Sequence, residues 1–346
     1  MPHHFHTLKR TEWFAIIIIM LVAFVFRFES LGDPVALTPI FGFFIVPGMY
    51  LLIRKMFNWE IAVLCAFLLA SSSWHTLISR TGFREVAGVM LLVWALYFFW
   101  KGKSSLKLFD FAISGILIGA GFYTSLQYWL MPLIVILSII ALWEAIELSF
   151  HRDSHAHARL RLMRGFAMMM VTAVVVAFPI ISNFFFDPGL FVRPILSFSN
   201  VLFNMRSISY LFWPVAMLSI FGGIRSIAKC FITKRTHGHF PPSHILLLSW
   251  LILGTLHPLG YVFITPVLYV FAGEALWWLY DFCKKWYNIY DKHEVVIHEH
   301  HGRESTTVAM ITIGALLLAI TLNEHQTSLS YYEKNLPASS SLESGN

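Results

Sequence analysis

Charged residues are scarce in this sequence. Asp, Glu, Lys and Arg make up 13% of the 346 residues, whereas an ordinary soluble domain carries about 25%. The apolar residues, 57% of the chain, come in blocks of about 15 to 22, which is long enough to cross a hydrocarbon core of about 30 Å. The sequence therefore predicts a polytopic membrane protein.

Alternation of polar and apolar residues is also missing. The run AIIIIMLVAFVF at 15–26 is apolar throughout, which argues against transmembrane β-strands. Helices satisfy their backbone hydrogen bonds internally, as lipid requires, so we expect an all-α fold. The chain has only three cysteines, and nothing in their placement predicts a disulfide framework.

Motifs of common soluble enzymes are absent: the sequence has no P-loop, no GxSxG and no dinucleotide fingerprint. Histidine is plentiful, including the pairs His155-x-His157, His237-x-His239 and His298-x-His300. No cysteine or carboxylate completes a ligand set at a diagnostic spacing. We interpret these stretches as loops of biased composition and predict no metal site.

About eleven membrane helices are expected within one transmembrane domain, 1–322, followed by a polar tail, 323–346. The expected helices lie near residues 13–28, 36–53, 60–78, 86–100, 108–125, 130–148, 165–183, 208–224, 243–256, 260–282 and 306–322.

Orientation follows from the distribution of positive charge. Nineteen of the 25 Lys and Arg residues fall in connections on one side of the predicted membrane. Because cytoplasmic loops carry an excess of Lys and Arg, this side is predicted to be cytoplasmic. The N-terminus is then cytoplasmic and the C-terminus outside, in a bacterial-type cytoplasmic membrane.

The stretch WHTLISRTGFRE, Trp74 to Glu85, concentrates polar residues on the predicted outer side. Arg80 and Arg84 are four residues apart, as are His75 and Ser79, so each pair shares one face of a helix. Two guanidinium groups at a membrane boundary match the oxygens of a lipid phosphate or pyrophosphate. The bland alternative is interfacial anchoring by arginines whose charged heads reach the headgroups.

Three further positions are candidates. Arg193 lies in the longest predicted outer loop, and His257 lies in the outer turn LHPLGY, where it could donate to a phosphate. Glu274 lies in the middle of an apolar segment, where a carboxylate is costly and counts as a functional candidate. Each has a plainer alternative. Arg193 could lie in an ordinary solvated loop, and His257 could be a helix-end histidine without a role. Glu274 could be protonated and hydrogen-bonded to a neighbouring helix.

Five segments in this order resemble one family: FRFESLGDP, YLLIRKMF, SSSWHTLISRTGFRE, GAGFYTSLQYWLMPL and HPLGYVFITPVLYVFAGEALWWLY. Together they are similar to the bacterial GT-C integral-membrane glycosyltransferases of the dolichyl-phosphate-mannose protein mannosyltransferase type. The resemblance covers most of the chain. It implies transfer of a sugar from a polyprenyl-phosphate carrier to an acceptor on the outer membrane face.

The resemblance also implies roles for residues. An acid in the first outer loop would be the catalytic base, and Asp33 or Glu29 is the available choice. Arg80, Arg84 and Arg193 would hold the carrier phosphate, with His257 assisting and Ser79 and His75 nearby. The first outer loop is much shorter than in relatives of this family. Here LGDPVALTP runs directly into the second helix, whereas relatives have a longer loop at this place.

That shortening leaves alternatives open. One is a non-catalytic protein that still binds the lipid carrier, and another is a transporter of a lipid-linked sugar. We expect membrane lipid, a polyprenyl-phosphate-linked sugar and a glycan, lipid or protein acceptor as partners, and no nucleic acid. No cofactor is demanded, and only a divalent cation is left open.

Overall fold

The computed structural model describes residues 10–28, 38–80, 85–124, 128, 132–149, 156–186, 213–237, 240–256, 260–293, 306 and 309–323. All regular structure in this part of the chain is helical. The helices are α1 (Arg10–Phe28), α2 (Thr38–Met56), α3 (Trp59–Ser71), α4 (Ser73–Arg80), α5 (Glu85–Ser105), α6 (Leu108–Gly121), α7 (Pro132–Ser149), α8 (Ala156–Phe186), α11 (Trp213–His237), α12 (Pro242–Leu256) and α13 (Gly260–His293), with one more at Ala309–Asn323.

Each of the eleven expected segments contains or overlaps a helix. Six described helices are long and apolar enough to span a membrane, or seven if the bent pair α3 and α4 forms one span. The protein is an integral membrane protein. The count of eleven spans and the sides of the termini stay predictions, because several apolar helices are shorter than a full span.

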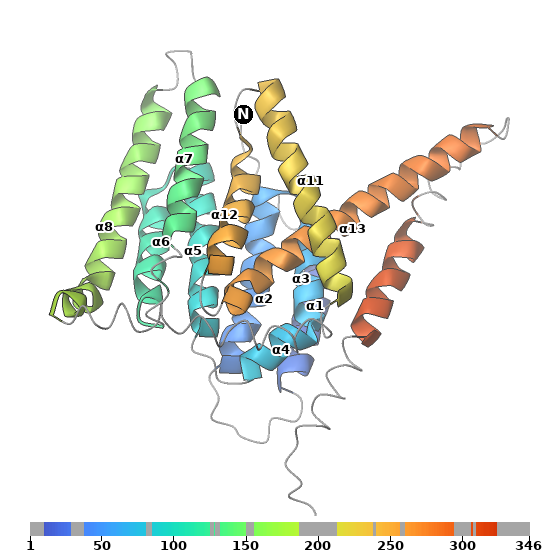
Figure 1. Ribbon diagram of the computed structural model, residues 1–346, viewed down its shortest axis with the longest axis horizontal. Helices are drawn as coiled ribbons and strands as arrows, with labels where there is room; N and C mark the ends of the chain where they lie inside the picture. Colours follow the sequence, from blue (N-terminus) through green and yellow to red (C-terminus); the bar gives the residue numbers. More distant parts are fainter. Residues whose placement is uncertain are drawn as a thin grey trace, which may run out of the picture.

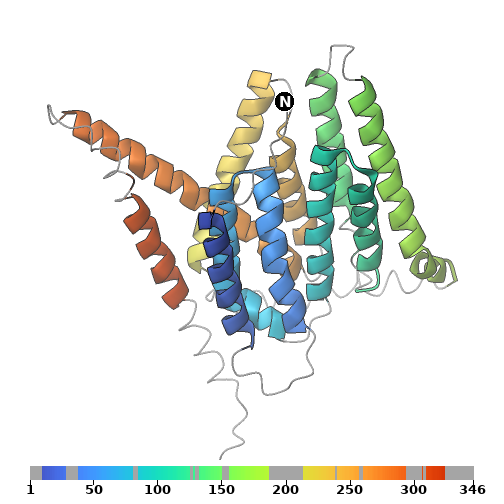
Figure 2. The same cartoon turned by 180° about the vertical axis from the view of Figure 1, so that it is seen from behind.

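Most helices stand side by side, and α13 crosses them obliquely and continues outward as an arm (Figures 1 and 2). The core lies where α2, α3, α5 and α13 meet, and it includes the fully buried Val46, Leu69, Leu92 and Val270. On the lipid side, α1, α8 and α11 expose large apolar side chains, as helices facing hydrocarbon do.

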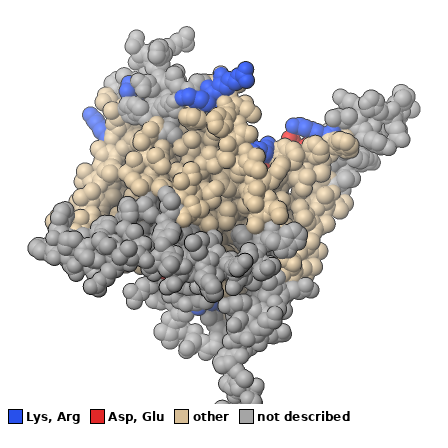
Figure 3. All heavy atoms as spheres, viewed as in Figure 1, with Lys and Arg blue, Asp and Glu red and all other residues tan. Residues whose placement is uncertain are grey.

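Ion pairs join helix ends on the predicted cytoplasmic side. Arg54 Nη2 lies 2.6 Å from Glu12 Oε2, which links the end of α2 to the start of α1. Lys101 Nζ lies 2.9 Å from Asp110 Oδ1 and links α5 to α6. Figure 3 shows Lys and Arg along the upper edge of the visible described surface, above a broad belt that lacks charge. Which side of the membrane this edge faces stays a prediction.

Candidate functional site

A break between α3 and α4 organises the predicted outer end of the helices. The two helices meet at an angle of 56°, with Ser72 in an extended conformation between them. The Ser72 hydroxyl accepts a hydrogen bond from the backbone N–H of His75 at 3.0 Å and another from the hydroxyl of Tyr269. Ser72 is thus the N-cap of α4, and the break directs α4 across the lower end of the neighbouring helices (Figure 1).

The guanidinium of Arg27 fills this break. Arg27 comes from the last turn of α1 and is completely buried. It donates to the carbonyl oxygens of Leu69 and Ala70, each at 3.2 Å, and to that of Ala23 in its own helix. Carbonyls in the last turn of a helix have no partner within it, so Arg27 satisfies groups that the end of α3 leaves open.

His75 is a further hydrogen-bond acceptor for Arg27. Nη2 of Arg27 lies 2.6 Å from Nδ1 of His75. A guanidinium can only donate, so Nδ1 accepts and the ring carries its proton on Nε2. His75 is 4% exposed. The predicted substrate-binding histidine therefore lies inside the helix junction, with Nδ1 bound to Arg27.

Arg80 reaches in the opposite direction. Its Nη2 donates to the carbonyl of Phe26 at 2.7 Å and its Nε to that of Arg27 at 3.3 Å. Two arginines thus donate to carbonyls at helix ends. Arg27 of α1 donates to the end of α3, and Arg80 of α4 donates to the end of α1. The bonds from Arg80 hold the end of α4 against the end of α1.

Ser79 lies on the face of α4 that packs against α2. It is fully buried, and its hydroxyl donates to the carbonyl of Thr76 at 2.7 Å. Opposite it is Gly42 of α2, where an added Cβ would lie 2.5 Å from the Cβ of Ser79. No other residue type leaves room for α4 at this distance, so Gly42 sets how closely the two helices pack.

The remaining predicted site residues lie outside the described part of the chain: Glu29, Asp33, Arg84, Arg193 and His257. The described part brings His75, Ser79 and Arg80 together on one short helix. It also shows Arg27 to be a central residue, which the sequence alone did not single out. The available signal was its position at the end of an apolar run, on the side where the insertion rule places few positive charges.

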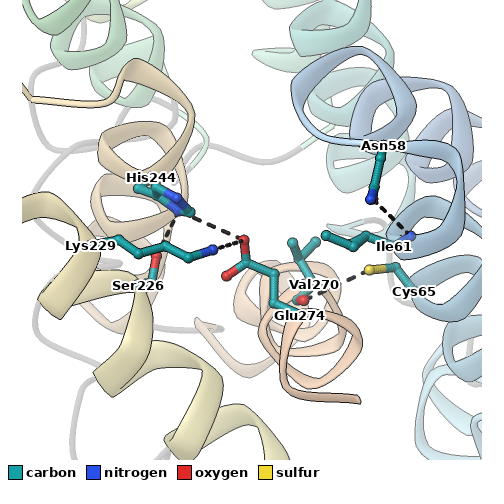
Figure 4. Close-up of polar contacts among 8 residues, drawn as sticks. All are labelled: Asn58, Ile61, Cys65, Ser226, Lys229, His244, Val270 and Glu274. Atoms are coloured by element: carbon teal, nitrogen blue, oxygen red, sulfur yellow. Dashed lines mark hydrogen bonds and ion pairs between the residues drawn. The ribbon is translucent and has the colours of Figure 1, made fainter. Parts of the chain in front are cut away.

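Glu274, the predicted intramembrane carboxylate, lies in a second polar cluster. Lys229 Nζ and His244 Nδ1 lie 3.7 and 3.8 Å from its Oε1 (Figure 4). The hydroxyl of Ser226 is 3.0 Å from the same ring nitrogen of His244. These groups come from α11, α12 and α13 and join the three helices. Glu274 is 1% exposed, and neither of its carboxylate oxygens has a hydrogen bond in the described structure.

The described residues contain no group of three or more His, Cys, Asp or Glu that could hold a metal ion. Of the three histidine pairs, the pair at 298–300 lies wholly outside that part, and His155 and His239 are also outside it.

No protein-family model and no curated protein matches the sequence, but the fold matches solved structures. One is the oligosaccharyltransferase AglB from Archaeoglobus fulgidus in complex with an inhibitory peptide and a dolichol-phosphate, with a TM-score of 0.53 at 16% identity. The match covers 94% of this chain and 50% of that one. The oligosaccharyltransferase of the same organism in its apo form gives 0.52 at 16% identity, over 94% and 50% of the two chains.

The chain has the GT-C fold. The resemblance of the five sequence segments predicted it, and the structural match confirms it. At this identity the likeness concerns the fold, and the chain spans about half the length of the structures that it matches.

Proposed function

We propose that this GT-C protein is a membrane glycosyltransferase that takes a sugar from a polyprenyl-phosphate carrier and transfers it to an acceptor on the outer membrane face. The observation that carries the proposal is the fold match over 94% of the chain to an oligosaccharyltransferase bound to dolichol-phosphate. The eleven-span topology and the bacterial-type cytoplasmic membrane are the finer parts of the same proposal.

In this proposal, Arg80, Arg84, Arg193 and His257 form a rim that holds the carrier phosphate. The hydrogen bonds from Arg80 to the carbonyls of Phe26 and Arg27 hold the end of α4 against α1, which gives Arg80 a defined position at that end. A planar guanidinium binds two phosphate oxygens at once. The buried His75 and Ser79 act as positioning residues beneath that rim.

The transfer step needs a base and a stabilised leaving group. The carboxylate of Asp33 or Glu29 removes the proton from an acceptor hydroxyl, and the hydroxyl oxygen forms a bond to the anomeric carbon of the sugar. The bond between that carbon and the phosphate oxygen breaks, and the carrier leaves as a phosphate anion. The arginines stabilise the negative charge that develops on the leaving oxygen.

The test uses proteoliposomes supplied with polyprenyl-phosphate sugars labelled on the sugar. Wild-type protein is expected to release the lipid phosphate and to transfer the label. Asp33→Asn should slow release by about 100-fold or more, as loss of a general base does, and Glu29→Gln shows which acid is used. Arg84→Gln should slow it by about tenfold or more.

Arg161→Gln is the matched control, because it removes an exposed arginine near the start of α8, on the predicted cytoplasmic side. It should leave release unchanged. Carrier binding without release from any common sugar donor would identify a non-catalytic carrier-binding protein. Absence of both binding and release would reject the proposal altogether.

A further inference from the structure

Helices α11 and α13 cross and then diverge, forming a V that opens toward the predicted cytoplasmic side (Figures 1 and 2). Gly222 of α11 lies at the crossing, directly against the backbone of Phe271 in α13. A side chain at this position would push the helices apart. Beyond the crossing, Figure 3 shows basic and acidic atoms at the surface between the body and the α13 arm.

Arg225 lies one turn beyond this crossing on α11. Its guanidinium is 5.6 Å from the ring centroid of Trp278 on α13, a cation–π arrangement. Within the described residues it has no ion pair and no hydrogen bond, so none of its five N–H donors has a protein partner there. Arg225 is partly exposed, so these donors are open to a ligand.

Two other cations of the V lie beside carboxylates. Lys229 lies beside Glu274 at 3.7 Å, and Lys285 pairs with Asp281 at 2.7 Å. Arg225 forms no ion pair within the described residues, although the charges of Glu274 and Asp281 act on it at longer range. Lys284 of α13 is a further cation without an ion pair among the described residues. This region therefore carries surplus positive charge, which is complementary to an anionic group.

The surroundings of Arg225 indicate that this anion belongs to a lipid. Phe221, Trp278, Phe282 and Trp286 follow one another with ring centroids 5.0, 5.2 and 6.0 Å apart. Phe282 and Trp286 are 44% and 65% exposed. Such aromatic side chains gather at the level where lipid headgroups meet acyl chains, whereas a water-soluble anion gains nothing from them.

We propose that Arg225, flanked by Trp278, binds the phosphate group of an anionic phospholipid from the predicted cytoplasmic leaflet. The guanidinium donates to two phosphate oxygens, and the acyl chains lie along the exposed aromatic residues of α13. Occupancy fills the V and joins the α13 arm to α11. This site is separate from the carrier site proposed at the opposite membrane face.

The experiment is native mass spectrometry of the full protein in detergent, titrated with phosphatidylglycerol or phosphatidylcholine. Wild-type protein should prefer phosphatidylglycerol. Arg225→Gln should weaken phosphatidylglycerol binding by about tenfold, or about 1.4 kcal/mol, and should bind the two lipids equally. Arg161→Gln, which removes an exposed arginine from α8, should bind phosphatidylglycerol as the wild type does.

Three results would overturn the proposal. They are unchanged phosphatidylglycerol binding by Arg225→Gln, an equal loss in Arg161→Gln, and displacement of the lipid by an excess of inorganic phosphate, which would indicate a site for the free anion. If Arg225→Gln does not elute as a single folded species, Trp278→Leu takes its place. It should weaken phosphatidylglycerol binding by about threefold through loss of the cation–π contact, and unchanged binding would again reject the site.

Discussion

Nη2 of Arg27 lies 2.6 Å from Nδ1 of His75, deep in the junction of α1, α3 and α4. Arg27 is buried without a carboxylate partner in the described structure, and its acceptors there are three backbone carbonyls and this imidazole. A buried charge is expensive unless it is fully hydrogen-bonded. The two terminal nitrogens of Arg27 are bonded to neutral oxygen and nitrogen atoms, whereas its Nε has no hydrogen-bond partner in the described structure.

Replacing Arg27 by Gln should destabilise the protein strongly. The shorter amide cannot reach both Leu69 and Ala70, so the carbonyls at the end of α3 lose their donors. We expect a loss of about 2 to 3 kcal/mol, the range for hydrogen bonds to charged groups, measured as a lower melting temperature in detergent. Arg161→Gln serves as the control, and equal melting temperatures for the two variants would contradict this account.

Replacing His75 shows whether its hydrogen bond to Arg27 or only its size stabilises the junction. Asn can place its side-chain oxygen near the position of Nδ1, whereas Leu fills space without accepting from Arg27. We expect His75→Leu to lose about 1 to 3 kcal/mol, the penalty of leaving a buried donor unpaired, and His75→Asn to lose less. Thermal unfolding of both variants tests this order, and a His75→Leu variant as stable as His75→Asn would disprove the hydrogen bond's role.

The contact between Gly42 and Ser79 can be tested by a double-mutant cycle. Gly42→Ala introduces a methyl group 2.5 Å from the Cβ of Ser79, and overpacking of this kind typically costs about 1 to 3 kcal/mol. Ser79→Gly removes the opposing Cβ and alone costs about 1 kcal/mol through lower helix propensity.

The double variant should be more stable than the sum of the two single changes predicts, with a coupling of about 1 kcal/mol. Stabilities are measured by thermal unfolding. Strictly additive losses would show that α4 moves away without cost when Gly42 is replaced.

Replacing Lys229 alone should destabilise the protein more than replacing both Lys229 and Glu274. Lys229→Met leaves the buried carboxylate of Glu274 without its nearest cation, and we expect a loss of about 1 to 2 kcal/mol because Lys229 is itself partly exposed. Adding Glu274→Gln removes the orphaned charge and should restore most of the stability. A double variant less stable than Lys229→Met would mean that the two residues act independently.

The all-helical membrane fold was predictable because length and apolarity alone determine which segments lipid accepts. The position of α5, expected at 86–100, was close to the observed Glu85–Ser105. The segment expected as one helix at 60–78 is instead broken at Ser72. Hydropathy does not register such a break, because the residues on both sides remain apolar enough to lie in the membrane.

The candidate site was predictable in composition but not in arrangement. The four-residue spacing of His75 and Ser79 agrees with their place on α4, which ends at Arg80. The sequence did not show that the donors of Arg80 serve the end of α1. The partner of His75 is Arg27, from a different helix, and a single sequence holds no periodic signal for contacts between distant segments. For the same reason Glu274 stood alone in the sequence, whereas the fold places Lys229 and His244 beside it.

Arg27 and His75 are 48 positions apart in the chain. During synthesis, α1 is complete well before the residues that accept from Arg27 have been made. The first helix therefore enters the membrane with a positive charge that has only Ala23 of its own helix to bind, and lipid headgroups or water must solvate it meanwhile. The junction thus also sets an order of assembly, in which α1 settles only after α3 and α4 have arrived.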